Sequence, residues 1–194
     1  DMLHNNVVRL TEFLLSRGSI DVSKRPILVY GCELALSTLT SFASIAVISI
    51  FIQDFISSLL FIAIFFFLRL FAGGFHASTY ARCFFITNGV YLATYGSAYI
   101  LETYAMRSVT LIIGLVSGLI ILLLTPVQNI KHPLSPDRLI TNKKISRFLV
   151  CFEIMFLILA FFVGNDTHFF FIFAASLAAV AVMMVIPKFE ERRG

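Results

Sequence analysis

The sequence contains few charged residues, and this scarcity decides the class of protein. Only 13% of its 194 residues are charged, whereas 59% are hydrophobic. A soluble domain of this length cannot hide so much apolar surface inside one core. The chain therefore needs lipid as part of its solvent, which excludes an ordinary water-soluble globular domain.

Several kinds of functional site are also missing from the sequence. Its three cysteines form no paired framework, which excludes a disulfide scaffold. His4, His132 and His168 have no companions at ligand spacing, so we expect no metal site and no cofactor. There is no nucleotide-binding glycine loop and no nucleic-acid-binding module. Residues 1–15 lack the apolar core and cleavage site of a signal peptide, so no cleavage is expected there.

What the sequence does have is long apolar runs. A helix needs about 20 apolar residues to cross about 30 Å of hydrocarbon, and no run alternates like a membrane-barrel strand. We therefore predict an all-α, polytopic integral membrane protein with about six transmembrane helices. Gln53 and Asp54 interrupt the longest run, so a tight hairpin is expected there. The predicted spans are residues 27–52, 55–71, 84–101, 108–124, 148–163 and 168–187.

The distribution of charge orients these spans. With the N-terminus in the cytoplasm, every Lys and Arg of the chain's 15 except Arg107 falls on the cytoplasmic side. The three outer turns carry one acid each, namely Asp54, Glu102 and Asp166. Because cytoplasmic segments are enriched in Lys and Arg, we predict a multi-pass cell-membrane protein with both termini in the cytoplasm.

Two segments outside the spans complete the predicted organisation. Residues 3–17 place apolar side chains on one helical face, which favours an N-terminal amphipathic helix in the membrane interface, within a cytoplasmic segment 1–26. A solvated helix is the alternative. The stretch 125–147 is basic and is expected to be a cytoplasmic loop. It is too short to fold independently, so residues 1–194 form a single transmembrane domain.

Residues suited to chemistry gather in the segment 69–83, between the second and third predicted spans. Gly73 and Gly74 disfavour a continuous helix and favour a bend. In one straight helix, His76 and Cys83 would share a face but lie about 10 Å apart. A bend would bring the imidazole to the thiol and generate a thiolate nucleophile. On spacing alone, a helix-end histidine and a packed cysteine is the commoner arrangement.

Charged residues near this segment are candidates for supporting roles. Arg69 and Arg82 are expected to stabilise a thiolate or to hold a substrate carboxylate. Glu33 lies inside the first span, where an ionisable group is costly, and is a candidate orienting group. Its alternative is an ion pair with Lys24, Arg25 or another basic residue near the helix end.

The basic stretch 125–147 has two explanations. Its lysines, Lys131, Lys143 and Lys144, fit electrostatic capture of an acidic substrate tail. Cytoplasmic segments are also basic for topological reasons and attract anionic membrane lipid. The two explanations are compatible.

Two motifs carry a resemblance to a known family. Arg69, Gly74, His76 and Cys83 form the pattern R-x4-G-x-H-x6-C, and residues 125–136 form a proline-containing basic segment. In these motifs and in its predicted topology the chain resembles the accessory gene regulator protein B family. These are membrane endopeptidases that process a quorum-sensing propeptide in Gram-positive bacteria.

The resemblance implies a catalytic pair, a reaction and partners. His76 and Cys83 would be catalytic at the cytoplasmic face, with Arg69 and Gly74 supporting them. Cys83 would cleave off the acidic C-terminal tail of a propeptide and keep the rest as a thioester. Cyclisation to a thiolactone or lactone autoinducing peptide would follow. The resemblance also implies a homodimer, and the pattern Gly114-x-x-x-Gly118 fits either a dimer or packing within the chain.

A rival function is a small membrane transporter or peptide-export component without protease chemistry. It would use Glu33 and Glu153 along a pathway and the small-residue pattern for helix packing. Glu153 has the alternative of an ion pair with Arg147. Such a protein would not require Cys83.

Overall fold

A computed structural model describes the chain at residues 9, 12, 25–75, 79–128, 135–163 and 167–191. Apart from one isolated bridge, the residues in these ranges form no β-structure, so the all-α prediction is confirmed. The helices are α2 (Arg25–Ile52), α3 (Phe55–Ala72), α4 (Tyr80–Thr103), α5 (Arg107–Leu124), α6 (Pro136–Val163) and α7 (Thr167–Glu191).

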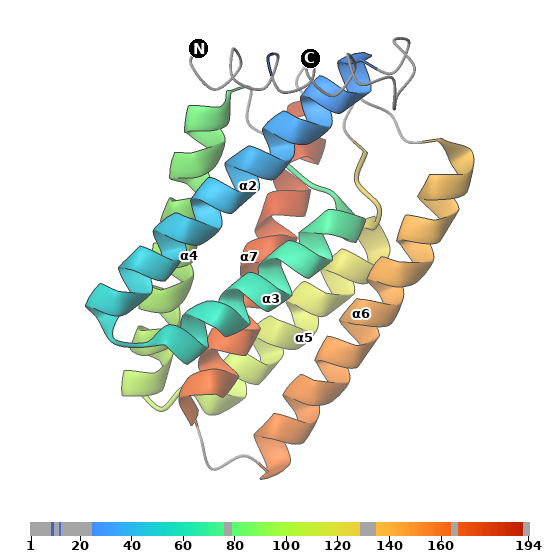
Figure 1. Ribbon diagram of the computed structural model, residues 1–194. Helices are drawn as coiled ribbons and strands as arrows, with labels where there is room; N and C mark the ends of the chain where they lie inside the picture. The colour runs from blue at the N-terminus through green and yellow to red at the C-terminus, as the bar shows by residue number, and fades with distance from the viewer. Residues whose placement is uncertain are drawn as a thin grey trace.

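The six helices run alternately in opposite directions (Figure 1). The beginnings of α2, α4 and α6 and the ends of α3, α5 and α7 therefore lie at one end of the bundle, which we call the site end. The turns from α2 to α3 and from α4 to α5 lie at the opposite end. The hairpin predicted at Gln53 and Asp54 is confirmed, since α2 ends at Ile52 and α3 begins at Phe55. Gln53 makes the turn with a φ of 60°.

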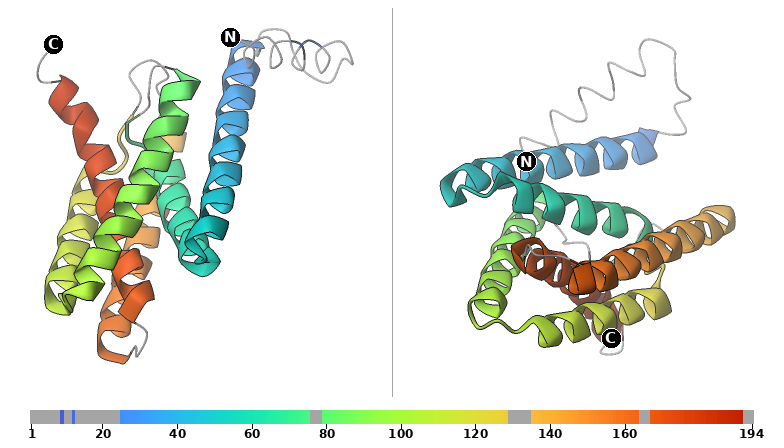
Figure 2. Two further views of the ribbon diagram at one scale, coloured as in Figure 1. Left: turned by 90° about the vertical axis from the view of Figure 1, so that its left-hand side faces the viewer. Right: turned by 90° about the horizontal axis from the view of Figure 1, so that it is seen from below.

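Five of these helices are long and apolar enough to cross a membrane, which agrees with the multi-pass prediction. Helix α4, with 24 residues, has the length to cross, but polar side chains such as Thr87, Asn88 and Thr94 are spread along it. It lies beside the other helices of the bundle (Figure 2). The count of six crossings and the side of the termini stay predictions. The five candidate spans are Gly31–Ile52, Phe55–Ala72, Arg107–Leu124, Pro136–Val163 and His168–Pro187.

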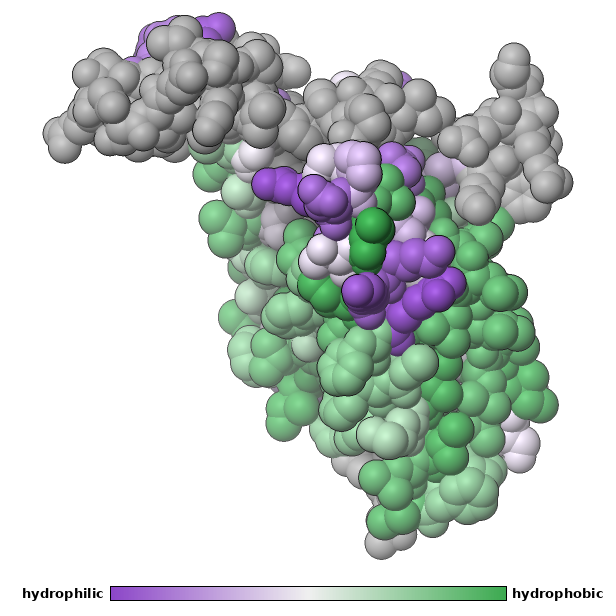
Figure 3. All heavy atoms as spheres, turned by 90° about the vertical axis from the view of Figure 1, so that its right-hand side faces the viewer, coloured by the Kyte–Doolittle hydropathy of each residue, from purple (hydrophilic) through white to green (hydrophobic). Residues whose placement is uncertain are grey.

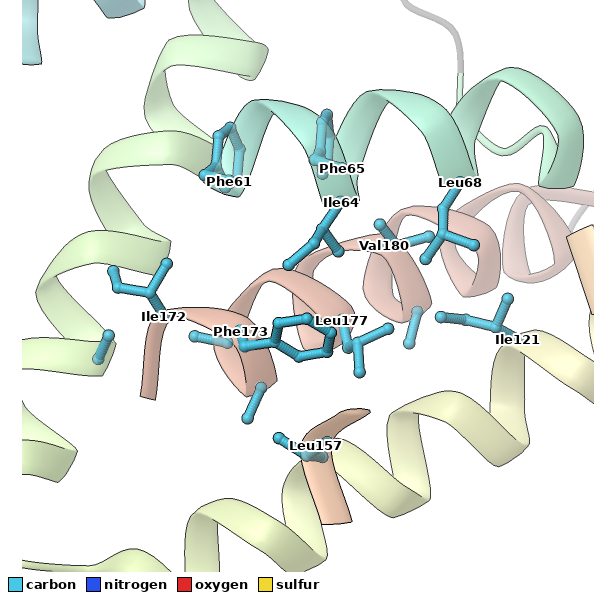
Figure 4. Close-up of a cluster of buried hydrophobic side chains, with 14 of the residues drawn as sticks. Phe61, Ile64, Phe65, Leu68, Ile121, Leu157, Ile172, Phe173, Leu177 and Val180 are labelled. Carbon is cyan, nitrogen blue, oxygen red and sulfur yellow. The ribbon is translucent and has the colours of Figure 1, made fainter. Parts of the chain in front are cut away.

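Helix α7 is the centre of the bundle. In its candidate span, 67% of the most apolar stretch is buried inside the protein, compared with 22% to 39% in the other four. It packs against α3, α4 and α5, and Figure 4 shows its side chains meeting those of α3, α5 and α6. The labelled side chains of this core are Phe61, Ile64, Phe65, Leu68, Ile121, Leu157, Ile172, Phe173, Leu177 and Val180.

The glycine pattern of α5 is used for packing inside the chain. A Cβ on Gly114 would lie 2.3 Å from a Leu157 methyl carbon, and one on Gly118 would lie 2.6 Å from Ile154. Both contacts are with α6, so these glycines let α5 and α6 approach closely. The homodimer implied by the resemblance stays a prediction, and this pattern no longer supports it.

The outer surface of the bundle is apolar, as a lipid-facing surface must be. Phe51 of α2 and Phe162 of α6 lie near the end of the bundle opposite the site end, and their side chains are 82% and 77% exposed. Figure 3 shows a broad hydrophobic surface on one face, with hydrophilic side chains gathered towards the site end. Because water cannot satisfy polar groups in hydrocarbon, this division marks the part of the protein that sits in lipid.

The prediction of a loop at 125–147 is wrong for the second half of this stretch. Residues from Pro136 onward are helical, and α6 runs unbroken for 28 residues to Val163. Proline is tolerated in the first turn of a helix, and Asp137 in that turn favours the helix dipole. The polar composition of 136–147 therefore reflects a helix that extends beyond the apolar core, since 28 residues span about 42 Å.

Candidate active site

The end of α3 forms the first part of the candidate site. Helix α3 ends at Ala72, and the next two residues, Gly73 and Gly74, have φ angles of 76° and 126°. Residues with a Cβ rarely adopt such angles, whereas glycine adopts them at little steric cost. The bend predicted at the two glycines is confirmed.

Gly73 is also required by a close approach of two backbones. The N–H of Val127 donates to the carbonyl of Ala72 at 2.8 Å, and Gly73 and Val127 form a parallel bridge. A Cβ on Gly73 would lie only 2.0 Å from the Val127 carbonyl oxygen. The connection after α5 therefore packs directly on the bend, and only glycine fits there.

Phe75 precedes His76, and both its backbone N–H and its backbone carbonyl are hydrogen-bonded. Its N–H donates to the carbonyl of Met183 in α7 at 2.8 Å, and its carbonyl accepts from Nη2 of Arg69. The backbone that leads into His76 is thus fixed between α3 and α7. His76 itself lies outside the described residues, so its approach to Cys83 stays a prediction.

Arg69 lies in the last turn of α3, and its guanidinium reaches several groups of the site. The guanidinium carbon is 5.5 Å from the ring centroid of Phe65, and Nη2 donates to Phe75. The side chain is partly exposed, but its Nη1 atom is buried and has no hydrogen-bond partner among the described residues. Cys83 lies near enough to Arg69 for the guanidinium charge to act on a thiolate there. A buried cationic donor without an acceptor favours an anionic or carbonyl oxygen beside it.

Cys83 lies in the first turn of α4. Thr79 caps this helix: its side-chain oxygen accepts from the N–H of Arg82 at 3.3 Å, and its carbonyl accepts from the N–H of Cys83 at 3.0 Å. The positive end of the helix dipole therefore lies at the thiol and favours an anion there. Cys83 is partly exposed, and Arg82 in the same turn is exposed.

The structure places Glu33 in the helix that packs against α4. Its side chain is 6% exposed and has interaction partners. Arg25, one of the basic partners considered for it, pairs instead with Glu12 at 3.0 Å. The two helices are joined by a hydrogen bond from Ser44 to Asn88 at 2.8 Å. An orienting role for Glu33 stays a prediction.

Comparison with protein families gives a match that covers nearly the whole chain. The model of a family described as accessory gene regulator B matches residues 7–186. The chain belongs to the accessory gene regulator B family. Comparisons with curated proteins and with solved structures found no match. Membership in the accessory gene regulator B family assigns the chain a role in quorum sensing. The members of this family are processing enzymes.

The basic residues of this accessory gene regulator B protein form an exposed surface on the first half of α6. Lys143, Lys144 and Arg147 are all exposed there, whereas Lys131 lies outside the described residues. Figure 3 shows hydrophilic side chains on the face of the bundle that carries α6. Ser146 points inward and bonds Thr125 at 2.6 Å, which ties α6 to the connection that packs on Gly73.

A polar cluster lies at the end of the bundle opposite the site end, and the spacing of residues in the sequence did not predict it. His168 Nε2 lies 2.8 Å from Asp54 Oδ2, and His168 Nδ1 lies 2.5 Å from Glu102 Oε2. We call Asp54, Glu102 and His168 the opposite-end cluster. A signal was present, because each predicted outer turn carried one acid, but helix packing had to bring them together. Within the described ranges, no group of three or more His, Cys, Asp or Glu residues is arranged to hold a metal ion.

Arg107, the one basic residue assigned to the outer side, also acts at the opposite end. Its Nη2 donates to the carbonyls of Ala160 and Phe161, at 3.1 and 2.7 Å. These carbonyls belong to the last turn of α6, where helical partners run out and a cation is favoured. Capping α6 therefore explains why a cation is retained against the overall charge distribution.

Proposed function

We propose that this member of the accessory gene regulator B family is a membrane cysteine endopeptidase with Cys83 as nucleophile and His76 as general base. The observation that carries the proposal is the position of Cys83, in the first turn of α4 and near enough to Arg69 for the guanidinium charge to act on its sulfur. A thiolate, not a thiol, is the attacking species, and both positive partners favour it.

The proposed reaction begins with transfer of the Cys83 proton to the His76 imidazole. The Cys83 Sγ then forms a bond to the carbonyl carbon of the scissile peptide, and the carbonyl electrons move to oxygen. When the C–N bond breaks, the His76 imidazolium returns the proton to the leaving amine. The C-terminal tail departs, and the rest of the propeptide stays bound to Cys83 as a thioester.

Arg69 is suited to stabilise the charge that develops in this step. Its Nη2 is occupied by the carbonyl of Phe75, whereas its buried Nη1 has no acceptor among the described residues. A donor held in place before the reaction stabilises an oxyanion at little reorganisation cost. We therefore assign Nη1 of Arg69 to the oxyanion or to the Cys83 thiolate.

The thioester is released by a group of the substrate itself. A cysteine thiol of the propeptide attacks the thioester carbonyl, its proton passes to His76, and the Cys83 thiolate leaves. A thiolactone forms, or a lactone when a serine attacks. Exchange of one thioester for another keeps the acyl group activated, and restricted access of water lets ring closure compete with hydrolysis.

The substrate we propose is a short propeptide with an acidic C-terminal tail. Exposed Lys143 and Lys144 supply positive charge on a helix that is tied through Ser146 and Thr125 to the connection beside Gly73. Attraction between this surface and an acidic tail would raise the local concentration of substrate. The same surface also suits anionic lipid at the cytoplasmic face.

The proposal is tested by expressing the chain together with a propeptide encoded beside its gene. We expect Cys83→Ala and His76→Ala to abolish release of the tail, measured by mass spectrometry of the peptide products. Cys151→Ala is the matched control, because Cys151 is an exposed cysteine on α6 and should leave cleavage unchanged. Continued cleavage by both site variants would refute the protease assignment.

The second candidate, a transport component, has one observation in its favour. Glu153 of α6 is 8% exposed, and its Oε2 has no hydrogen-bond partner among the described residues. An unpaired carboxyl group within a membrane helix is costly and often serves transport. This candidate predicts that Glu153→Gln blocks peptide export while Cys83→Ala leaves export intact. The opposite pattern supports the protease.

A further inference from the structure

Helix α7 contains a proline four residues beyond Met183. Within an α-helix, the N–H of residue 187 would donate to the carbonyl of residue 183. Pro187 has no N–H, so the Met183 carbonyl loses its intrahelical donor although α7 continues to Glu191. Met183 is only 4% exposed, so little water can replace the missing donor.

A donor from outside the helix takes this carbonyl. The N–H of Phe75 donates to it at 2.8 Å, and a Cβ on Gly74 would lie 3.0 Å from the same oxygen. The bend after α3 therefore packs directly on the backbone of α7, at the one turn where a proline has freed an acceptor. The carbonyls that lack an intrahelical donor are ordinarily those of a helix's last turn. The Met183 carbonyl loses its donor within α7 instead, and it accepts from the segment that leads into His76.

We infer that Pro187 is a positioning residue of the active site. By lacking an N–H, it reserves the Met183 carbonyl for Phe75 and so holds the Gly73–Phe75 segment between α7 and Arg69. The inference rests on the proposed function, because its catalytic effect passes through His76, the next residue in the chain. It assigns a role to a residue more than 100 positions away from the motif.

The structural alternative is that Pro187 only shapes or destabilises the last turns of α7. Two substitutions separate the alternatives. Pro187→Ala restores an N–H that competes with Phe75 for the Met183 carbonyl. Replacement of Pro187 by lactic acid, the analogue of alanine with a hydroxyl group in place of the amino group, forms a backbone ester. The ester removes the proline ring but still offers no N–H. The ester variant should therefore behave like wild type if the missing donor is what matters.

The experiment uses the full chain in lipid nanodiscs, with the propeptide of the co-expression experiment as substrate. We expect Pro187→Ala to lower kcat by about tenfold to a hundredfold with little change in KM, because a misplaced general base slows chemistry more than binding. The ester variant should restore kcat. Ile186→Ala, which changes a neighbour that is 36% exposed and keeps its N–H, is the matched control and should behave like wild type.

A second readout needs no substrate. In a Cys32→Ser, Cys151→Ser background, the rate of Cys83 alkylation by iodoacetamide is followed against pH by intact mass. His76→Ala should shift this pH profile, Pro187→Ala should shift it in the same direction, and the ester variant should return it. A purely structural proline would alter thermal unfolding without moving the profile.

The outcomes separate this inference from the proposed function. If Cys83→Ala still cleaves the propeptide, the proposed function fails and the inference fails with it. If Cys83→Ala is inactive but Pro187→Ala keeps the wild-type kcat and pH profile, only the inference is overturned. If Pro187→Ala unfolds early, the ester variant decides: wild-type kcat supports the inference, and a loss overturns it.

Discussion

Arg69 combines interactions that a lysine cannot reproduce. Its planar group lies over Phe65 and donates to the carbonyl of Phe75 through Nη2, and its second nitrogen, Nη1, is buried without a hydrogen-bond partner among the described residues. Guanidinium presents several donors in a rigid fork, whereas an ammonium group is a single point of charge. Shape, and not charge alone, is therefore what this position requires.

We predict that Arg69→Lys lowers kcat/KM for propeptide cleavage by about tenfold to a thousandfold, as loss of a preorganised donor to an oxyanion does. The measurement is cleavage kinetics in nanodiscs. Arg138→Lys, at an exposed position of α6, is the control and should leave kcat/KM unchanged. Equal activity of Arg69→Lys and wild type would show that positive charge alone suffices.

The glycines of the bend offer a sharper comparison. We predict that Gly73→Ala destabilises the fold by about 2 kcal/mol or more, because its φ is positive and its Cβ would meet Val127. Gly31→Ala is the matched control. A Cβ on Gly31, in α2, would have no other atom within 4 Å, so alanine there should be neutral or stabilising. Thermal unfolding in detergent measures both. Equal unfolding temperatures would contradict the close approach.

At the scale of elements, the opposite-end cluster joins three helices. Asp54 caps α3 by accepting from the N–H of Ser57 at 3.1 Å, and Tyr95 of α4 donates to it at 3.3 Å. His168, at the start of α7, lies between Asp54 and Glu102. Each ring nitrogen of His168 thus contacts a carboxyl group from a different helix, and both nitrogens can donate only when the imidazole is protonated. The cluster thus ties α3, α4 and α7 electrostatically.

The pH dependence of this tie follows from Asp54. Burial alone would raise the pKa of Asp54, but hydrogen bonds from Ser57 and the interaction with His168 outweigh it, so the pKa lies below its ordinary value. A carboxyl group with a lowered folded-state pKa stabilises the fold at a pH above its unfolded pKa of about 4. That contribution is lost as the pH falls through the folded-state pKa.

We therefore predict that Asp54→Asn lowers the unfolding temperature at pH 6. The difference in unfolding temperature between this variant and wild type should become smaller as the pH falls below about 4. Thermal unfolding in detergent at a series of pH values is the measurement. The control is Asp137→Asn, which changes an exposed acid at the start of α6, so its difference from wild type should be small and should change little with pH. A gap between Asp54→Asn and wild type that stays constant in acid would contradict the prediction.

At the scale of the whole molecule, the bundle separates an apolar body from a basic site end. Helix α6 illustrates this division, because its first half carries exposed cations and its second half exposes Phe152, Phe156 and Phe162. Charges at the site end are open to solvent, so salt screens them over about 8 to 10 Å at ordinary ionic strength. Their effect on substrate capture should therefore depend on salt.

We predict that Lys143→Gln together with Lys144→Gln raises KM for an acidic-tailed propeptide by about two- to fivefold at low salt and by less at high salt. The charge-preserving pair Lys143→Arg and Lys144→Arg is the control. Initial rates at two salt concentrations provide the measurement. An effect of the same size at both concentrations would argue against electrostatic capture.

Features that depend on neighbours in the chain could be predicted from the sequence. Apolar runs predicted the helices, the polar pair at 53 and 54 predicted the hairpin, and Gly73 and Gly74 predicted the bend. Each follows from hydropathy or backbone preference within a few residues. The prediction was wrong at 136–147, because a polar composition does not distinguish a loop from a helix that leaves the membrane.

By itself, then, the sequence determined the membrane-helical class, the bend at the two glycines and the motif, including Cys83, by which the chain resembles its family. Only the tertiary structure decided which groups meet: Phe75 with Met183, Arg69 with Phe75, and His168 with two carboxylates. Several of these pairs are more than 60 residues apart in the chain. Helix packing brings them together, and hydropathy and spacing carry no information about which face of each helix turns inward at a given depth.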